Sequence, residues 1–252
     1  MFEFCNYEMT LPEAYHEALR DLYYYGLDSD CADWNTTQKE LSMTFCVKHP
    51  LQEPMISKCF IGGPEELQQY VMEMLDGILD FEIDRGNWSY TYHQRYADQY
   101  QFVIDELRRN PSSRRAVMTI WDKAKDDYSD EPPCFNHCQF FIRNNELHMK
   151  VLFRSNDACK ATFMNAFALI MMQKRVADEL GVKVGTYTHR ANSFHCYEKD
   201  YELLKGYVNR IESSETLEDI AYSYDDEDGW KEMMDAAIPA INKKVEELKN
   251  NG

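Results

Sequence analysis

Hydrophobic and polar residues follow two periods along this chain, one typical of helices and one typical of strands. Helical spacing, bounded by proline, capping and glycine signals, predicts helices at six places. These are residues 11–25, 64–77, 95–110, 160–180, 198–211 and 229–249. The helix over 64–77 has the fullest set of signals, because Pro64 and two acidic residues open it and Gly77 follows its last apolar turn.

Alternating patterns predict strands in the second half of the chain. One strand covers residues 116–121 and another passes through 184–187. Between them, two β-rich segments are joined by Asn144 and Asn145, a pair that suits a hairpin turn. The acidic stretch 122–133 is expected to be a loop. Because strands and helices interleave without a strict βαβ rhythm, the pattern favours an α+β fold over a doubly wound parallel sheet.

Composition is that of an ordinary globular protein. Hydrophobic residues make up 44% and charged residues 28% of the 252 positions, enough apolar material for a sizeable core. One domain over residues 1–252 fits this length, although two small domains would fit it too. No stretch approaches the roughly 18 apolar residues of a membrane span, and the first residues lack the pattern of a secretion signal. We therefore expect a soluble, cytoplasmic protein that does not bind a membrane.

The charge balance is acidic, with a formal net charge of −17. No basic stripe is present, so general nucleic-acid binding is disfavoured, and any phosphate ligand must be met by local arginines. About half of the charge lies in the C-terminal segment 211–252, where 12 acidic and 4 basic residues give −8. Such a run, which includes residues 225–228, usually marks a solvated face.

Cys134 is the first candidate for chemistry. Eight cysteines are too few for a disulfide scaffold, so thiols are expected. Cys134 follows a proline pair at the edge of a predicted strand, and Arg154 ends the neighbouring hairpin strand, where its charge would lower the pKa of the thiol. A buried structural thiol is the commoner alternative. A metal site made of Cys134, His137 and Cys138 is disfavoured because no second cluster completes it, so no metal is expected.

Further residues accompany Cys134 in a specific order. They are Arg114-Arg115, Pro133-Cys134, Gln139, Arg154-Ser155-Asn156-Asp157, Asn165, Gly185 and His195-Cys196-Tyr197. In this order and spacing the chain resembles the core of the thymidylate synthases and their pyrimidine nucleotide hydroxymethylase relatives. The resemblance covers residues 114–197 without a gap. An Arg-Ser-x-Asp signature twenty residues after Pro-Cys, followed by Asn and His-x-Tyr in register, is a specific pattern.

The resemblance implies a fold and an assembly. We expect a single α+β domain around a mixed, bent β-sheet that is packed by helices on one face and against a two-fold mate on the other. In such a homodimer Arg114 and Arg115 would reach the phosphate bound by the partner subunit, where guanidinium groups clamp oxygens well. Taken alone, this arginine pair could equally be a solvated strand edge.

The resemblance also implies the chemistry. Cys134 would add to carbon 6 of dUMP, after which carbon 5 takes the one-carbon unit of 5,10-methylenetetrahydrofolate to give dTMP. Because negative charge then develops on a carbonyl oxygen, the site needs preorganised donors as well as a thiolate. Arg154 would serve both the thiolate and the phosphate, Ser155 would add a hydroxyl, and Gln139 would be a further substrate-binding residue.

Asn165 would identify the base. It lies in the predicted helix 160–180 on an apolar face, where an unpaired amide would cost about 1–3 kcal/mol. An amide satisfied by nearby backbone is the alternative. By resemblance this position pairs with the base, and an asparagine there indicates uracil because cytosine-using relatives carry an aspartate.

The remaining assignments also come from the resemblance. His195 and Tyr197 would hold the sugar hydroxyl and Asp157 the folate ring, although a strand-end histidine, a packed tyrosine and an N-cap aspartate are the alternatives. Upstream, Glu73 would order water and help to protonate the base, unless it is a surface glutamate. Tyr92 would position water, with Tyr90 as its competitor.

Several positions depart from the family pattern. Phe135 stands where the synthases usually have histidine, Phe153 where glutamine is usual, and Ala161-Thr162-Phe163-Met164 precedes Asn165 in place of a Gly-x-Pro-Phe run. Residues 35–39 occupy the region of an N-terminal Arg-x-Gly phosphate loop, so Lys39 or the threonines are candidates to replace it. The last residues are charged instead of forming a short apolar tail.

These departures leave two enzymatic products open. Shielding the intermediate from water gives dTMP, whereas admitting water gives a 5-hydroxymethyl nucleotide. We favour thymidylate synthesis, with a uracil, or less readily a cytosine, nucleotide hydroxymethylase as the alternative. A pseudoenzyme that binds nucleotide without turnover is the third hypothesis.

Overall fold

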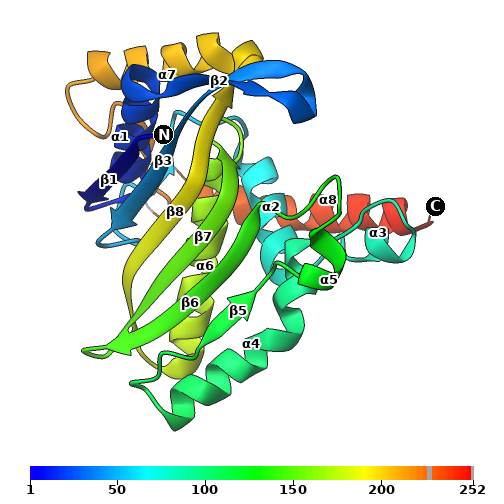
Figure 1. Cartoon of the computed structure of the whole chain (residues 1–252). Helices are drawn as coiled ribbons and strands as arrows, with labels where there is room; N and C mark the ends of the chain where they lie inside the picture. The colour runs from blue at the N-terminus through cyan, green and yellow to red at the C-terminus, as the bar shows by residue number, and fades with distance from the viewer. Residues whose placement is uncertain (226–228, 251–252) are drawn as a thin grey trace.

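A mixed β-sheet forms the frame of the molecule (Figure 1). The computed structural model describes residues 1–225 and 229–250. Within them the sheet has seven strands in the order β1-β3-β8-β7-β6-β5, with β2 also paired to β3, and β4 pairs with β9 separately. The strands are β1 Glu3–Glu8, β2 Leu27–Cys31, β3 Thr36–Val47, β4 Ile56–Ser57, β5 Val117–Thr119, β6 Phe135–Arg143, β7 Glu146–Asp157, β8 Lys183–Tyr197 and β9 Ala221–Tyr222.

Strand direction brings three chain segments to one edge of this sheet. Strands β7 and β8 are parallel, with Asp157 opposite His195, so their carboxyl ends lie together. Strand β6 runs antiparallel to β7, with Phe135 opposite Phe153, so its amino end lies at the same edge. A register shift between Phe135 and His137 bends β6 at this edge, while a second shift, between residues 147 and 149, lies near the opposite end of β7.

The predicted hairpin with its turn at Asn144 and Asn145 is confirmed as the β6–β7 pair. Asn144 and Asn145 both adopt positive φ angles, 52° and 62°, between the paired residues Arg143 and Glu146. Asparagine tolerates this left-handed backbone, which a two-residue turn of matching twist requires. The turn sets the register from Arg143 to His137, and the one-residue shift between His137 and Phe135 then brings Cys134 opposite Arg154.

Helices cover one face of the sheet, and Figure 1 views the other face. They are α1 Leu11–Tyr25, α2 Pro64–Asp76, α3 Phe81–Asp84, α4 Tyr92–Arg109, α5 Lys123–Asp126, α6 Thr162–Leu180, α7 Tyr201–Ser213 and α8 Trp230–Asn250. Helix α6 is buried on nearly every side because it packs on β7 and β8 and beneath α2 and α4. Across the described ranges, no helix is both long and apolar enough to cross a membrane.

The α+β prediction with a mixed sheet covered by helices on one face is confirmed. The helix predicted over 95–110 begins earlier, at Tyr92, because the Thr91 side chain caps it by accepting the Gln94 amide at 3.0 Å. The helix predicted from residue 198 opens with a short 3₁₀ turn, and α7 begins at Tyr201. The predicted loop 122–133 contains the short helix α5.

The strands were predicted less well than the helices. The strand predicted to pass through 184–187 is confirmed as β8, but it is 15 residues long, and β5 is shorter than the predicted 116–121. Strands β1 to β4 were not predicted. In β3, the buried hydrophobic residues Leu41, Met43, Phe45 and Val47 alternate with Ser42, Thr44 and Cys46, so a two-residue period was available in the sequence there.

The acidic C-terminal segment 211–252 contains the end of α7 and all of α8, and α8 packs on α2. Ile241 and Val245 of α8 join Met72 and Leu79 in a small apolar cluster. The acidic side chains of α8 are exposed, as expected of a solvated face. Residues 226–228 of the acidic run lie outside the described residues. Packing of α8 thus stabilises the position of α2, the helix that carries Glu73.

This packing makes a stability prediction. Ile241→Ala should lower the free energy of unfolding by about 2–4 kcal/mol, because Ile241 is fully buried and its loss leaves a cavity between α8 and α2. Urea unfolding followed by circular dichroism measures the change. Lys243→Ala, an exposed position on the same helix, is the matched control and should change stability little. Equal midpoints for the two variants would contradict the packing role of α8.

Candidate active site

Most of the predicted site residues meet at the sheet edge where β6 begins and β7 and β8 end. Cys134 precedes β6, while Arg154, Ser155 and Asp157 end β7. His195 and Tyr197 end β8, Asn165 lies in the first turn of α6, Glu73 lies on α2, and Tyr92 begins α4. Side chains from six separate elements therefore surround one location.

Arg154 holds the segment that carries Cys134. Its Nε and Nη2 atoms donate to the carbonyl oxygens of Pro133 and Pro132 at 3.1 and 2.8 Å. Its backbone N–H donates to the carbonyl oxygen of Cys134 at 2.8 Å. The guanidinium is thereby fixed near the thiol, as the hairpin register predicts.

The electrostatic balance at Cys134 differs from the sequence expectation. Burial raises the pKa of the Cys134 thiol above its ordinary value, and the Arg154 charge opposes this without overcoming it. The expected net lowering of the Cys134 pKa is therefore wrong, although Arg154 acts in the expected direction. Sequence could not show that desolvation, a tertiary effect, is the larger contribution.

This balance predicts how alkylation of Cys134 depends on pH. Only the thiolate reacts, so its reaction with iodoacetamide should increase with pH up to a thiol pKa above the ordinary value. Arg154→Met should shift that profile to still higher pH, because it removes the charge that lowers the pKa. Peptide mass spectrometry follows Cys134 separately, and the exposed Cys5 in the same digest is the internal control. Coincident Cys134 profiles in the two proteins would contradict the electrostatic role of Arg154.

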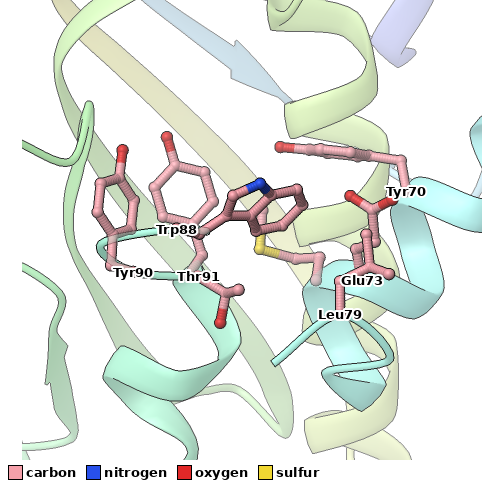
Figure 2. A pocket seen from close by; sticks show the side chains of 8 residues that line it. Tyr70, Glu73, Leu79, Trp88, Tyr90 and Thr91 are labelled. Carbon is pink, nitrogen blue, oxygen red and sulfur yellow. The ribbon is translucent and has the colours of Figure 1, made fainter. Parts of the chain in front are cut away.

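A cavity of about 230 Å³ opens beside this edge. Figure 2 shows Tyr70 and Glu73 projecting from α2 on one side and Trp88, Tyr90 and Thr91 from the segment before α4 on the other. Its lining consists of Tyr70, Glu73, Met74, Leu79, Trp88, Tyr90, Thr91 and Tyr92. An aromatic lining of this kind suits a planar ligand.

The sequence analysis missed Tyr70 and Trp88 as site residues. Tyr70 lies three positions before Glu73, so both side chains fall on one face of α2. Trp88 is 44% exposed in the aromatic run that also supplies Tyr90 and Tyr92. The helical spacing and the aromatic run were the available signals.

Glu73 is partly buried in this cavity rather than displayed on the surface. Burial raises the pKa of its carboxyl group above the ordinary value, while a hydrogen bond from Gln69 and the charge of Lys244 act in the opposite direction. Gln69 Nε2 donates to Glu73 Oε1 at 2.7 Å. Such a carboxyl group can hold a proton closer to neutral pH than an exposed glutamate can.

Tyr90 and Tyr92 both line the cavity, so the structure does not choose between them by position. Tyr92 is the more enclosed, and burial raises the pKa of its hydroxyl well above the ordinary value. That hydroxyl also has a hydrogen bond with the backbone of Phe135, next to Cys134. Tyr92 is therefore bonded to the strand that begins directly after Cys134.

Asn165 is buried, with 4% of its surface exposed. Its Oδ1 accepts a hydrogen bond from the hydroxyl of Tyr70. The partner of the amide is thus a side chain from another helix rather than nearby backbone.

His195 has one ring nitrogen, Nε2, that is available to bind a ligand. The side chain is 3% exposed, and Nε2 has no hydrogen-bond partner among the described residues. Nδ1 lies 3.4 Å from both Ser155 Oγ and the carbonyl oxygen of Ser193, and the Tyr197 ring packs edge-on against the imidazole. Burial lowers the pKa of His195, which favours the neutral imidazole, while the charge of Asp157 acts in the opposite direction. Donation from Nδ1 to the carbonyl would leave Nε2 as an acceptor for a hydroxyl.

Asp157 has a local structural contact as well. Its Oδ1 accepts the backbone N–H groups of Cys159 and Lys160 at 3.0 and 2.9 Å. This caps the turn that leads from β7 into α6, much as the N-cap alternative proposed. The second carboxylate oxygen takes no part in these two bonds.

Three predicted substrate residues lie away from the cavity. Arg114 and Arg115 are exposed before β5, where Arg115 pairs with Glu106 at 3.1 Å. Gln139 follows Cys134 by five strand positions, roughly 16 Å, and its Nε2 donates to the Arg114 carbonyl oxygen at 2.8 Å. Within one chain these residues therefore do not contact the Cys134 site.

Two of the residues that depart from the family pattern, Phe135 and Phe153, pack against each other. Phe135 and Phe153 are opposite each other in β6 and β7, and their rings stack at 5.0 Å. The stack continues from Phe153 to His189 at 4.8 Å and from His189 to Phe45 at 4.7 Å. An aromatic column thus crosses four strands under the site.

Lys39, the candidate for a phosphate-binding residue near the N-terminus, already has partners. Its Nζ atom lies 3.2 Å from Asp28 Oδ1 and donates to the Gly26 carbonyl oxygen, so its charge is paired within the β2–β3 hairpin.

The disfavoured metal site at Cys134, His137 and Cys138 gains no support from the structure. His137 is half-buried and Cys138 is fully buried in the core. No group of three or more potential metal ligands occurs in the part of the chain that the structure describes.

Comparison with known proteins agrees with this geometry. The family model described as thymidylate synthase matches residues 66–234. The chain belongs to the thymidylate synthase family. The matched region contains every predicted site residue, from Glu73 to Tyr197.

Relatives in this family come from archaea and bacteria. A protein named "Putative thymidylate synthase" from Methanocaldococcus jannaschii is 37% identical over 160 residues, which are 58% of this chain and 69% of that protein. One of the same name from Methanococcoides burtonii is 32% identical over 211 residues, 81% of this chain and 94% of that protein. Thermostable thymidylate synthase A from Bacillus subtilis shares the fold, with a TM-score of 0.64 at 17% identity over 80% of this chain and 85% of that one.

Proposed function

We propose that this chain is a thymidylate synthase that converts dUMP into dTMP with 5,10-methylenetetrahydrofolate as the one-carbon donor. One observation carries the proposal. In a member of this family, Cys134 lies beside Arg154 at the sheet edge, and its thiol is near Tyr70, Tyr90 and Tyr92 of the aromatic cavity. Glu73 lines the same cavity, and Tyr70 donates to Asn165.

The chemistry begins at Cys134. Its thiolate forms a bond to carbon 6 of the uracil ring, and the electron pair of the 5,6 double bond moves through carbon 5 onto the O4 oxygen. Carbon 5 then bonds to the methylene carbon of the folate. Loss of the carbon 5 proton then breaks the bond between the methylene carbon and the folate nitrogen, which releases tetrahydrofolate and leaves an exocyclic methylene group on carbon 5. Hydride transfer from tetrahydrofolate to this methylene gives the methyl group and dihydrofolate, and the 5,6 double bond re-forms as the bond between carbon 6 and the Cys134 sulfur breaks.

The side chains around Cys134 bind the nucleotide and assist these reaction steps. Asn165 pairs with the base edge and donates toward the oxygen on which charge develops. The raised pKa of Glu73 suits a group that passes a proton through water to that edge. His195 accepts from the sugar hydroxyl through Nε2, and Arg154 and Ser155 meet the phosphate.

The folate site adjoins the nucleotide site. The aromatic cavity fits a flat heterocycle, with the partly exposed Trp88 as a stacking surface. Asp157, which ends β7 outside the cavity lining, would accept from ring N–H groups. Phe135 is fully buried and packs edge-on against Tyr92. This apolar backing favours exclusion of water, and therefore methyl transfer over hydroxymethylation.

The functional unit is a homodimer of single-domain chains spanning residues 1–252. The face of the sheet without helices would pack against its two-fold mate. Arg114 and Arg115 are exposed and far from Cys134 of their own chain, as expected if they reach the phosphate of the partner subunit.

Mass spectrometry of the nucleotide tests the proposal. Purified protein is incubated with dUMP and methylenetetrahydrofolate, and dTMP is expected in a one-to-one ratio with dihydrofolate. A 5-hydroxymethyl product would instead identify a hydroxymethylase. Binding of dUMP, UMP or dCMP without any product would identify a nucleotide-binding pseudoenzyme.

A further inference from the structure

The contact between Tyr70 and Asn165 joins two helices within the site. Tyr70 lies on α2 one turn before Glu73, and its hydroxyl donates to Oδ1 of Asn165 on α6. Burial raises the pKa of the Tyr70 hydroxyl far above neutrality, so the hydroxyl keeps its hydrogen. Among the described residues no other acceptor for this hydrogen is recorded.

An asparagine amide alone does not select between uracil and cytosine. With its oxygen toward ring N3 and its nitrogen toward position 4, the amide pairs with uracil, which offers N3–H and O4. Turned by 180°, the same amide donates to N3 of cytosine and accepts from its amino group. Selection therefore depends on whatever prevents the amide of Asn165 from turning.

We propose that Tyr70 is the positioning residue that holds the Asn165 amide in its uracil orientation and thereby sets base specificity. The inference rests on the proposed function, in which Asn165 pairs with the base. The hydroxyl uses one lone pair of Oδ1 and leaves the second for N3–H, while Nδ2 remains a donor for O4. In the turned amide, N–H groups would face the tyrosine hydroxyl, and its buried hydrogen would lose its acceptor.

Binding calorimetry with dUMP and dCMP measures this specificity. Tyr70→Phe removes only the hydroxyl and should reduce the ratio of the dCMP Kd to the dUMP Kd about tenfold, which corresponds to about 1.4 kcal/mol. The matched control is Tyr100→Phe, since the Tyr100 hydroxyl also donates to a residue of α6, Glu179, at 3.2 Å but lies outside the cavity. This control should leave the ratio unchanged.

A double-mutant cycle separates positioning from a general packing effect. In an Asn165→Ala background, Tyr70→Phe should no longer change the ratio, because its effect passes through the amide. If Tyr70→Phe does not fold, Tyr70→Met fills similar volume without a hydroxyl and should show the same tenfold loss.

The outcomes distinguish this inference from the proposed function. A wild-type protein that prefers dUMP, together with an unchanged ratio in Tyr70→Phe or Tyr70→Met, overturns the role of Tyr70 alone. An equal change in the Asn165→Ala background overturns it as well. A wild-type protein that binds neither nucleotide overturns the proposed function and this inference with it.

Discussion

Cys134→Ser is expected to reduce dTMP formation by roughly 10⁴-fold or more, because covalent catalysis is lost with its nucleophile. A serine hydroxyl fits the same space and keeps the backbone bond between Cys134 and Arg154, but it does not ionise near neutral pH. Release of tritium from dUMP labelled at carbon 5 measures the covalent step directly, since that proton leaves only after the ring has been activated. Binding of dUMP should persist, because Arg154, Asn165 and His195 remain in place.

Cys5→Ser is the matched control for this variant. It makes the same chemical change at an exposed thiol on β1, away from the site, and should leave turnover unchanged. Turnover by Cys134→Ser within tenfold of the wild-type rate would remove Cys134 from the mechanism. Loss of both turnover and dUMP binding would point to a folding defect instead, which thermal unfolding would reveal.

Sequence reasoning found the residues whose position depends on neighbouring strands. Cys134 and Arg154 are linked by one tight hairpin, so a turn signal at Asn144 and Asn145 and two strand patterns were enough to bring them near each other. The one-residue shift that makes them direct neighbours was not predicted. The helices that carry Glu73 and Asn165 were also predicted, because capping residues, Pro64 and the glycines are local signals.

Contacts between distant segments could not be predicted in this way. The Tyr70–Asn165 bond joins residues 95 positions apart, and the parallel pairing of β1 with β3 has no local signal. Phe135 and Phe153 each depart from the family pattern, and only the strand register shows that the two rings pack together. The pKa of Cys134 was predicted in the wrong direction because burial depends on the whole fold.

Asn165→Asp is expected to lower kcat/KM for dUMP by roughly 10²-fold or more and to favour dCMP. The new side chain places a carboxyl oxygen, which cannot donate, against O4 of uracil, whereas it can accept a hydrogen bond from the amino group of cytosine. Position 165 is buried, so the pKa of an aspartate there should be raised. In its protonated form the carboxyl group donates to N3 of cytosine and accepts from the amino group. Activity with dCMP should therefore decrease as the pH rises through that pKa, since ionisation removes the donor.

The ratio of kcat/KM values for the two nucleotides, measured across pH, tests this expectation. Asn242→Asp is the matched control, because it makes the same change at an exposed position of α8 and should leave the ratio as in the wild type. A wild-type ratio in Asn165→Asp would remove Asn165 from base recognition. In the Asn165→Asp variant, the Tyr70 hydroxyl would donate to the new carboxylate and stabilise its ionised form. Adding Tyr70→Phe to that variant should therefore raise the pKa of the new carboxyl group further and move the decline of dCMP activity to higher pH.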